Sequence, residues 1–512
     1  MRRISRIYLF FALIALFYLG LPSFIRPLYP RDEGRYAEVA RQATDNGCWL
    51  IPYLNGIPHL TKPPLYYDLT GVAFSLLGQN LFSARLISVI SFMGCLLLTI
   101  KWAGKQGGIE AAKITAILTF AMVQPVLAGQ FGDLNMLLTF FVTAGMLLIF
   151  DGMLNPEKRY SWHWGWALVS LGFLVKGPPA LILPVGTISL FRIVHGRSAK
   201  INWKPLVAAF AIFMLIAAPW FLWILASMEK NVIPFWWKYS LQRSAINKER
   251  SSVFYFFNYL PIVILGTSGW GLAYYWGLIK RIKRSMPLLI NGQFSKGFMI
   301  LFSGANAFES FLLSWIIFTL AFFSLIRATM FSYIQPLYPA AALFLGVFYA
   351  KKYKTWSGFY LTHHKRIIAS LSMTCAIIWI FACVYYLARF APPSKKFIDN
   401  SYELNAVGDK IEPAKGRQFD LIQIDEFSPY INYVLKKDSI LVETEIHKDL
   451  PIPPAFSASW NSIEKKIQNN DPLLIVAKRK YLQEKKINNY NNINILFEGQ
   501  KFTVLKTRSL QF

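Results

Sequence analysis

The sequence predicts an all-α polytopic membrane protein that carries a small soluble domain at its C-terminal end. Hydrophobic residues make up 54% of the 512 residues and aromatic residues 16%, and a water-soluble surface does not tolerate that composition. Acidic residues are unevenly spread, because residues 1–390 hold twelve of the 27 and the last 122 residues hold the other fifteen. We therefore expect a long segment in lipid, followed by a tail in water.

Apolar runs of about 20 residues are long enough to cross a bilayer. The sequence contains eleven candidates, of which the fifth and sixth are short and are divided by Lys176-Gly177-Pro178-Pro179. They are residues 7–25, 83–102, 108–127, 134–151, 162–175, 177–194, 205–227, 254–279, 306–325, 329–350 and 366–390. We expect a transmembrane domain at 1–391, with long loops at 26–82 and 228–253, and a C-terminal α/β domain at 392–512.

Basic residues predict the orientation of the chain. They precede the first span (Arg2, Arg3, Arg6) and fill alternate loops, whereas the opposite short loops hold only Lys176 or Arg327. The positive-inside rule then places the N-terminus in the cytoplasm and both long loops and the tail on the opposite side of the membrane. This topology accounts for the net charge of +27. We expect no nucleic-acid partner, since no basic helix or base-stacking module accompanies the charge.

The first long loop is expected to contain two surface segments. Residues from Glu33 to Asn46 have helical periodicity, which would turn Arg35, Glu38 and Arg41 toward water. A second segment covers residues 65–77. In the tail, short β-like runs at 421–424, 439–442, 473–476 and 502–505 alternate with helical stretches such as 460–467. No motif of chemistry is evident in the tail.

Acidic residues mark the outer side of the predicted bundle. Asp32 and Glu33 open the first loop, and Asp133 begins the fourth span on the same side. Carboxylates beside a bilayer are costly unless they bind something or act as a base. Capping of the following helices accounts for Asp32 and Asp133 taken singly. It does not account for the basic residues at the same boundary, which are Arg35, Lys62, Lys176, Arg243 and Arg327.

Cations and carboxylates at one lipid–water boundary suit one class of reaction. Lys and Arg side chains bind phosphate, although snorkelling to the interface explains each of them equally well when taken alone. A carrier lipid would keep its chain in the bilayer and its phosphate among the cations. A carboxylate would then help to deprotonate an acceptor hydroxyl as that oxygen attacks the sugar carried by the lipid.

The motifs also resemble a known family. The run Tyr29–Glu38 resembles the first external loop of the GT-C glycosyltransferases, and more narrowly that of the bacterial lipid A aminoarabinose transferases, which are relatives of the protein O-mannosyltransferases. Further matches follow in order over about residues 1–350: Trp49–Gly56, Lys62-Pro63-Pro64, Asp133, Val175-Lys176-Gly177, Leu241-Gln242-Arg243 and Tyr333.

The resemblance implies an inverting transfer from a polyprenyl-phosphate sugar, with undecaprenyl phosphate as the usual bacterial carrier. Asp32 matches the principal catalytic carboxylate, Asp133 a second essential one, and Glu33 the other half of the acidic pair. Lys62 and Arg243 match positions near the donor phosphate. Other cavity positions are matched by Arg35, Lys176 and Tyr333, and Arg327 joins the expected phosphate-binding group through its place at the outer boundary.

The sequence departs from the family at a possible metal position. Thr61 stands where the aminoarabinose transferases commonly carry an acidic residue before the Lys-Pro pair. A divalent ion is therefore possible but not required, and we assign no metal ligand. His59 lies nearby, but a lone histidine is more often a hydrogen-bonding residue. The C-terminal part is also shorter than in those enzymes. The sugar or the acceptor is therefore not fixed as aminoarabinose or lipid A by the resemblance.

Three functions are compatible with these observations. The first is sugar transfer to lipid A or another envelope glycolipid. The second keeps the fold but glycosylates Ser or Thr of secreted protein. The third is a membrane transporter, which typically shows internal repeats and paired broken helices near the midplane. The sequence has no repeated half, which favours the enzyme. We expect a monomer, since no small-xxx-small face dominates a span.

Overall fold

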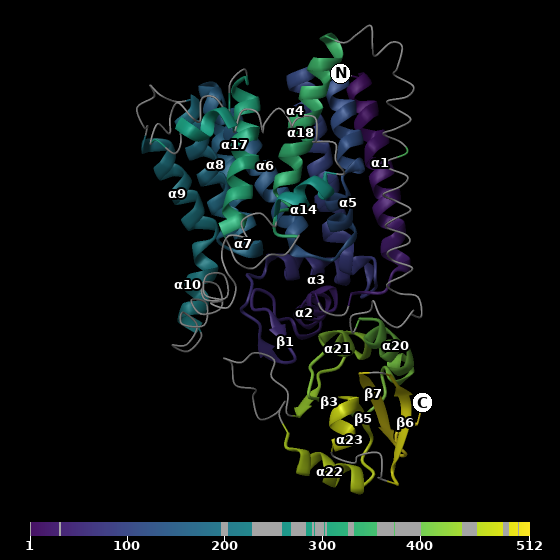
Figure 1. Ribbon diagram of the computed structural model, residues 1–512. Coiled ribbons are helices and arrows are strands. Elements are labelled where there is room, and N and C mark those ends of the chain that lie inside the picture. Colours follow the sequence, from purple (N-terminus) through teal and green to yellow (C-terminus); the bar gives the residue numbers. More distant parts are fainter. Residues whose placement is uncertain are drawn as a thin grey trace. The chain divides into compact units, whose positions relative to one another are not determined.

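The computed structural model describes residues 2–29, 32–195, 203–227, 259–267, 283–288, 305–325, 332–355, 401–442, 458–484, 491–499 and 501–511, and positions 291, 302 and 373. The chain divides into two compact units, whose elements are labelled in Figure 1. Unit 1 comprises Met1–Ser23, Thr61–Leu65 and Ile87–Ala382, and unit 2 comprises Phe24–Leu60, Tyr66–Leu86 and Cys383–Phe512.

Unit 1 consists of helices. Those described are α1 (Arg2–Ile25), α4 (Ser83–Ala121), α5 (Val123–Gln130), α6 (Leu134–Leu154), α7 (Arg159–Lys176), α8 (Pro179–His195), α9 (Trp203–Ile216), α10 (Ala218–Ser227), α14 (Tyr259–Gly266), α17 (Ala307–Leu325) and α18 (Leu337–Thr355), with a 3-10 turn at Pro156–Lys158. In the described part of the chain, α1, α4, α6 and α17 are long and apolar enough to cross a membrane, and α9 and α10 together form a further candidate bent by 44°. The chain is therefore a multi-pass membrane protein.

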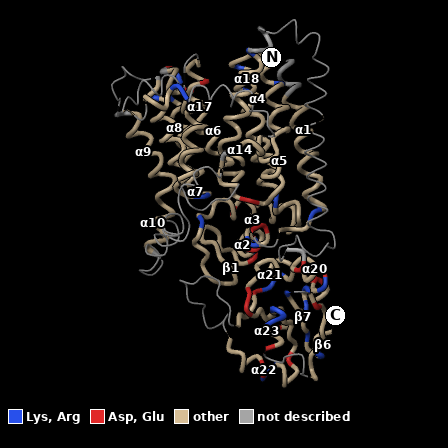
Figure 2. Tube along the Cα trace, in the orientation of Figure 1, with Lys and Arg blue, Asp and Glu red and all other residues tan. Residues whose placement is uncertain are grey.

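Charged residues lie mainly at the ends of the described helices of unit 1, and few lie along their middle parts (Figure 2). At one end, Asp151 near the end of α6 binds Lys105 at 2.9 Å and Lys158 at 3.3 Å. Lys351 of α18 pairs in the same way with Glu309 in the first turn of α17. Charged groups are kept out of the apolar middle because lipid and packed helices do not solvate them.

The predicted spans agree with the helices in some places and differ in others. Residues 83–102 and 108–127 were expected as separate spans, and α4 comprises two helical stretches that meet at a break at Gly108, whose φ of 77° suits glycine. The expected span at 329–350 begins as a helix only at Leu337. The loop at 228–253 lies outside the described residues. So do most of the expected span at 254–279 and all of 366–390 except position 373.

Helices α6 and α7 approach each other closely through glycine. A Cβ added to Gly145 of α6 would lie 2.8 Å from Val169 and 2.9 Å from the carbonyl of Gly165. A Cβ added to Gly165 of α7 would lie 2.6 Å from Ile149. Small residues let backbones approach within a membrane, where packing rather than the hydrophobic effect associates helices. The two glycines therefore set the spacing of this pair.

Unit 2 joins the first long loop to the C-terminal segment. The loop contributes α2 (Asp32–Asn46), a hairpin of β1 (Tyr53–Leu54) and β2 (Ile57–Pro58), and α3 (Leu65–Leu77). The C-terminal segment contributes α20 (Ser401–Ile411), a 3-10 turn (Glu412–Ala414), β3 (Asp420–Ile424), α21 (Pro429–Leu435), β4 (Ile440–Val442), α22 (Trp460–Gln468), β5 (Leu473–Lys478), α23 (Arg479–Glu484), β6 (Ile493–Glu498) and β7 (Phe502–Thr507). The helix expected in the first loop and the β-like runs of the tail are thus confirmed.

The C-terminal strands form one five-stranded sheet in the order β4-β3-β5-β7-β6. Strand β3 pairs in parallel with β4 and β5, whereas β7 pairs antiparallel with β5 and β6. Parallel neighbours need a crossover, and α21 lies between β3 and β4 in sequence. The central strands are buried and carry Ile, Leu and Val, as strands covered on both faces do.

One hydrophobic core connects the two parts of unit 2. It contains Ala37 and Ala40 of α2 and Phe74 of α3, together with residues of the C-terminal segment such as Tyr430 and Ile431. The prediction that Glu38 and Arg41 face water is wrong, because their exposed fractions are 0% and 5%. Helix α2 is covered by the C-terminal segment on the face that was assigned to solvent.

We predict that Gly165→Val lowers the stability of the protein in detergent by about 1–3 kcal/mol, since the new side chain must displace α6. The matched control is Gly20→Ala in α1, where a Cβ would meet nothing within 4 Å. Thermal unfolding followed by tryptophan fluorescence measures both. Equal melting temperatures for the two variants would contradict the glycine contact.

Candidate active site

Asp32 is the first residue of α2 and lies in unit 2. Its Oδ1 accepts a hydrogen bond of 2.6 Å from Nη2 of Arg35, one helical turn further on. The side chains of Asp32 and Arg35 are 41% and 32% exposed, respectively. Negative charge at a helix N-terminus is favoured by the helix dipole. The carboxylate is thus oriented by a neighbouring guanidinium and remains accessible.

Glu33, by contrast, is buried and fully engaged. Arg26 binds its two carboxylate oxygens at 2.7 and 2.9 Å, and Nε of Arg85 binds Oε1 at 2.8 Å. The backbone N–H of Tyr29 adds a bond of 2.7 Å. Burial opposes ionisation, but the charges and hydrogen bonds of Arg26 and Arg85 outweigh it and lower the pKa of Glu33 to about 2. Glu33 is therefore ionised at neutral pH.

Arg85 ties several segments of the first loop together. It lies in the first turn of α4, is 0% exposed, and also donates to the carbonyl oxygens of Arg26 at 2.7 Å and Pro27 at 2.8 Å. The end of the first span, the start of α2 and the start of α4 are thus joined through one guanidinium. The rigid five-donor fork of arginine makes such multiple contacts possible.

Asp133 lies in unit 1 and caps α6, as the capping interpretation expected. Its Oδ1 accepts from the backbone N–H of Asn135 at 3.2 Å, and its Oδ2 accepts from the amide of the same side chain. Ser88 of α4 bonds the backbone of Asp133 at 3.2 Å. The carboxylate is half-buried, and its orientation is fixed by the helix that it begins.

Lys176 is the other half of this group in unit 1. It ends α7, which Gly177 terminates at a φ of 82°. Its ammonium donates to Oδ1 of Asn135 and lies 4.1 Å from the centre of the Tyr333 ring. Lys62 and Asp133 are near enough to act electrostatically on Lys176. Unit 1 therefore brings Lys62, Asp133, Lys176 and Tyr333 together from four distant places in the sequence.

Two of the expected site residues, Arg243 and Arg327, lie outside the described residues. Among the residues described, no group of three His, Cys, Asp or Glu side chains is placed to bind a metal ion. His59 is buried, and its ring lies 6.4 Å from that of Tyr67. The steps proposed for the reaction use side chains of the chain alone.

The sequence interpretation missed three residues of these groups, namely Arg26, Arg85 and Asn135. Arg26 and Arg85 flank the first loop at the ends of two apolar runs, where a basic residue is ordinarily attributed to the interface. A signal existed for Arg26, which lies seven residues before Glu33 at the end of an apolar run, where a buried charge needs a partner. Asn135 follows Asp133 within an apolar span, where a polar amide is costly unless it is bonded.

We predict that Glu33→Gln destabilises the protein by about 3–5 kcal/mol, because Arg26 and Arg85 would remain buried without a counter-charge. A carboxylate with a lowered folded pKa stabilises above its unfolded pKa and loses that contribution as pH falls through the folded value. Wild-type stability should thus decline between pH about 5 and about 2. Thermal unfolding against pH should show a shallower slope for Glu33→Gln. An unchanged slope would contradict the proposed ion triad.

Comparison with known proteins shows what the chain is similar to. Residues 6–238 match the family model described as dolichyl-phosphate-mannose-protein mannosyltransferase. An undecaprenyl phosphate-alpha-4-amino-4-deoxy-L-arabinose arabinosyl transferase of Pectobacterium carotovorum is 30% identical over 342 residues, which cover 65% of this chain and 57% of that protein. The chain thus matches somewhat over half the length of that relative. An uncharacterized protein of Aquifex aeolicus is 24% identical over 96% of each chain.

Solved structures show the same fold. ArnT from Cupriavidus metallidurans, bound to undecaprenyl phosphate, aligns with a TM-score of 0.77 over 97% of both chains at 17% identity. The archaeal oligosaccharyltransferase AglB from Archaeoglobus fulgidus aligns with a TM-score of 0.55 over 93% of this chain and 69% of that one, at 12% identity. The chain is thus similar over residues 6–238 to the protein mannosyltransferase family and over 342 residues to aminoarabinose transferases, and it shares the fold of the solved ArnT structure.

Proposed function

We propose that the protein is an inverting glycosyltransferase that moves a sugar from undecaprenyl phosphate to lipid A or a related envelope glycolipid. The observation that carries the proposal is the group of Lys62, Asp133 and Lys176 in unit 1. Cationic side chains among apolar helices suit a ligand with a phosphate head and a hydrocarbon tail. The aminoarabinose transferases that the chain resembles are named for such a donor.

The donor phosphate is assigned to the cations of unit 1. Lys62 and Lys176 supply positive charge, and Asn135 together with Tyr333 holds the ammonium of Lys176 in place. Arg243 and Arg327 complete the proposed set. As the bond between the anomeric carbon and the phosphate oxygen breaks, charge develops on the departing lipid phosphate. Fixed cations stabilise that charge more than the ground state, which is how they accelerate the reaction.

Asp32 is assigned the role of general base. An acceptor hydroxyl oxygen attacks the anomeric carbon, its proton passes to Asp32, and the carrier leaves as a phosphate with the bonding electron pair. Attack from the face opposite the leaving group inverts the anomeric configuration. Arg35 orients the Asp32 carboxylate at 2.6 Å, and the exposure of the pair gives an acceptor access to it.

Two other carboxylates have supporting roles in this proposal. Glu33, which is enclosed by Arg26 and Arg85, holds the start of α2 and thereby Asp32, and it is not placed to exchange a proton with a substrate. Asp133 orients Asn135 and balances the charge of Lys176. Fixed partners keep each of these groups preorganised within its own unit, so that little reorganisation is needed during the reaction.

The proposed topology places this chemistry in the periplasm. Eleven spans with the N-terminus in the cytoplasm put the first loop, the loop at 228–253 and the domain at 392–512 outside the inner membrane. The abundance of basic residues at the opposite ends of the spans supports this orientation. A carrier lipid and lipid A would both reach such a site from the outer leaflet.

A second candidate acceptor is a Ser or Thr of secreted protein. The family model that matches residues 6–238 is described as a protein mannosyltransferase, which favours this alternative. The fold and the donor chemistry would be unchanged, because a hydroxyl oxygen attacks in both cases. The two acceptors differ in the mass of the product, so that one comparison separates them.

We predict that Asp32→Asn abolishes sugar transfer in membranes supplied with labelled undecaprenyl-phosphate aminoarabinose, while the donor still binds. Asp133→Asn should lower transfer strongly, because Asn135, which holds the ammonium of Lys176, loses the carboxylate that orients it. The matched control is Glu110→Gln, which removes an exposed carboxylate paired with Lys113 at 2.9 Å. Its transfer rate should equal that of the wild type.

Mass spectrometry identifies the acceptor in the same cells. Lipid A that gains the mass of the sugar only in the presence of the protein supports the glycolipid proposal. If only periplasmic proteins gain the mass of the sugar, the acceptor is instead a Ser or Thr of secreted protein. Unchanged transfer in both Asp32→Asn and Asp133→Asn would overturn the assigned roles.

A further inference from the structure

The run Leu54-Asn55-Gly56, one of the motifs matched in the sequence, has no role in the chemistry above. It forms a two-residue hairpin turn between β1 and β2, with φ of 55° at Asn55 and 71° at Gly56. Positive φ at both central residues is the type I′ geometry that Asn-Gly favours. Turn geometry alone favours Asn or Gly at position 55, and it does not explain why the side chain of Asn is present.

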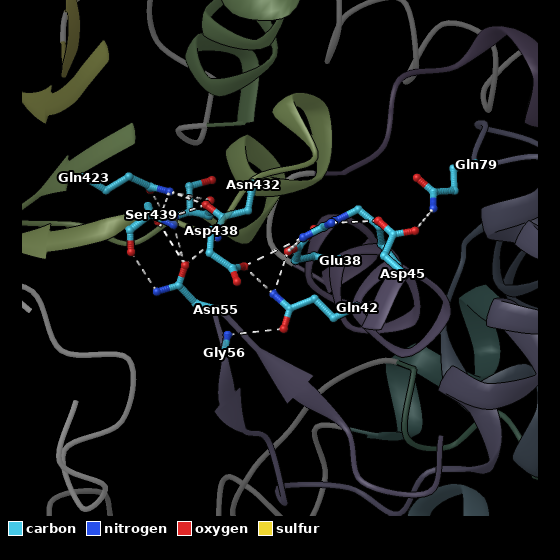
Figure 3. A network of polar contacts seen from close by, with 12 residues as sticks. Glu38, Gln42, Asp45, Asn55, Gly56, Gln79, Gln423, Asn432, Asp438 and Ser439 are labelled. Carbon is cyan, nitrogen blue, oxygen red and sulfur yellow. Dashed lines mark hydrogen bonds and ion pairs between the residues drawn. The ribbon is translucent and has the colours of Figure 1, made fainter. Parts of the chain in front are cut away.

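That side chain is buried against the C-terminal segment (Figure 3). Its Oδ1 accepts from the backbone N–H of Ser439 at 2.7 Å and from the amide of Asn432 at 2.7 Å. Its Nδ2 donates to the carbonyl of Ser439 at 3.0 Å. Gln423 of β3 in turn bonds Asn432 at 2.8 Å, so that the network reaches the sheet. Donor and acceptor groups of Asn55 are both used, and an aspartate could not replace it.

A second set of contacts joins α2 itself to the same region. Asp438 accepts from Nε2 of Gln42 at 2.7 Å and lies 3.7 Å from Arg41. Arg41 is clamped by Glu38 and Asp45 of its own helix at 2.7 and 2.9 Å. Gln42 also accepts from the N–H of Gly56, which connects the helix to the hairpin (Figure 3). Helix and hairpin therefore meet residues 432–439 as one body.

A third contact lies directly beside the proposed base. A Cβ on Gly34 would lie 2.9 Å from Cβ and 3.2 Å from Cα of Tyr430, so that α21 packs against the backbone of α2 two residues after Asp32. Only glycine permits this approach, because the obstructing atoms include backbone. The position of α21 thus limits where the first turn of α2 can lie.

These three contacts act on the element that carries Asp32 and Arg35. We propose that residues 430–439 of the C-terminal segment form a seat for α2, and that Asn55 is a positioning residue for the general base of the transfer reaction. The inference rests on the proposed function. Simple stabilisation of the fold is the competing explanation, since any buried hydrogen-bonded amide contributes to stability. The two explanations differ in what they predict for catalysis.

The test is Asn55→Gly in the full-length protein. Glycine keeps the positive φ of the turn and removes only the side-chain contacts. The matched control is Thr507→Val in β7, which removes a buried hydroxyl that donates to Asp471 at 2.7 Å and accepts from Leu473 at 2.9 Å, within the C-terminal segment alone. Transfer kinetics with labelled donor and hydrogen exchange of residues 32–46 are measured for both variants.

We expect Asn55→Gly to lower kcat by about tenfold or more, because a reacting group displaced by about 1 Å loses that much. The KM for the donor should stay within about twofold, since the donor phosphate is assigned to unit 1. Hydrogen exchange should rise in residues 32–46. Thr507→Val should leave kcat and the exchange of that segment unchanged, even where its melting temperature falls equally.

Equal losses of kcat in the two variants would overturn the positioning role and leave only stabilisation. Hydrogen exchange of residues 32–46 that does not change in Asn55→Gly would overturn it independently of any activity. Should Asn55→Gly fail to accumulate, Ser439→Ala keeps the backbone donor, removes the hydroxyl that bonds Asn55 at 3.2 Å, and is expected to show a smaller effect in the same direction. A wild type that transfers no sugar would refute the proposed function instead.

Discussion

The structure around the first loop depends on one constraint, which is that a buried charge must be paired. Glu33 satisfies this constraint through Arg26 and Arg85, which each bind both of its carboxylate oxygens. The triad therefore fixes the start of α2 relative to the start of α4. Asp32, which precedes Glu33 in the chain, is positioned by the same bonds although it takes no part in them.

The two units meet different physical requirements of the proposed reaction. A lipid phosphate needs cations that remain in place among apolar helices, and Lys176 is held there by Asn135 and by the face of the Tyr333 ring. A general base needs access to water and to an acceptor, which the exposed Asp32–Arg35 pair provides. Partly exposed polar groups would cost free energy among the apolar helices of unit 1, and that cost is smaller in unit 2.

Hydropathy predicted helices such as α1, α6 and α17 because apolar length is a local property of the sequence. Helix α2 was also predicted, but the polar face that carries Glu38 and Arg41 was wrongly assigned to water. Periodicity separates polar from apolar residues, and it cannot tell water from a polar partner such as Asp438, which lies 396 residues after Gln42. The same limit hid Arg85, whose partner Glu33 is 52 residues away. The pairing of distant charges requires the fold.

The junction between α2 and residues 430–439 uses apolar and polar contacts for different ends. Ala37, Ala40 and Tyr430 share a hydrophobic core, which stabilises the junction but tolerates small shifts, because dispersion and area burial are not directional. Hydrogen bonds from Asn55 to Asn432 and Ser439 tolerate no such shift, since a displaced network leaves buried donors and acceptors unpaired. The hydrophobic core thus stabilises the junction, and the amide network fixes the relative position of its two sides. A carboxylate that must meet a reacting hydroxyl needs both.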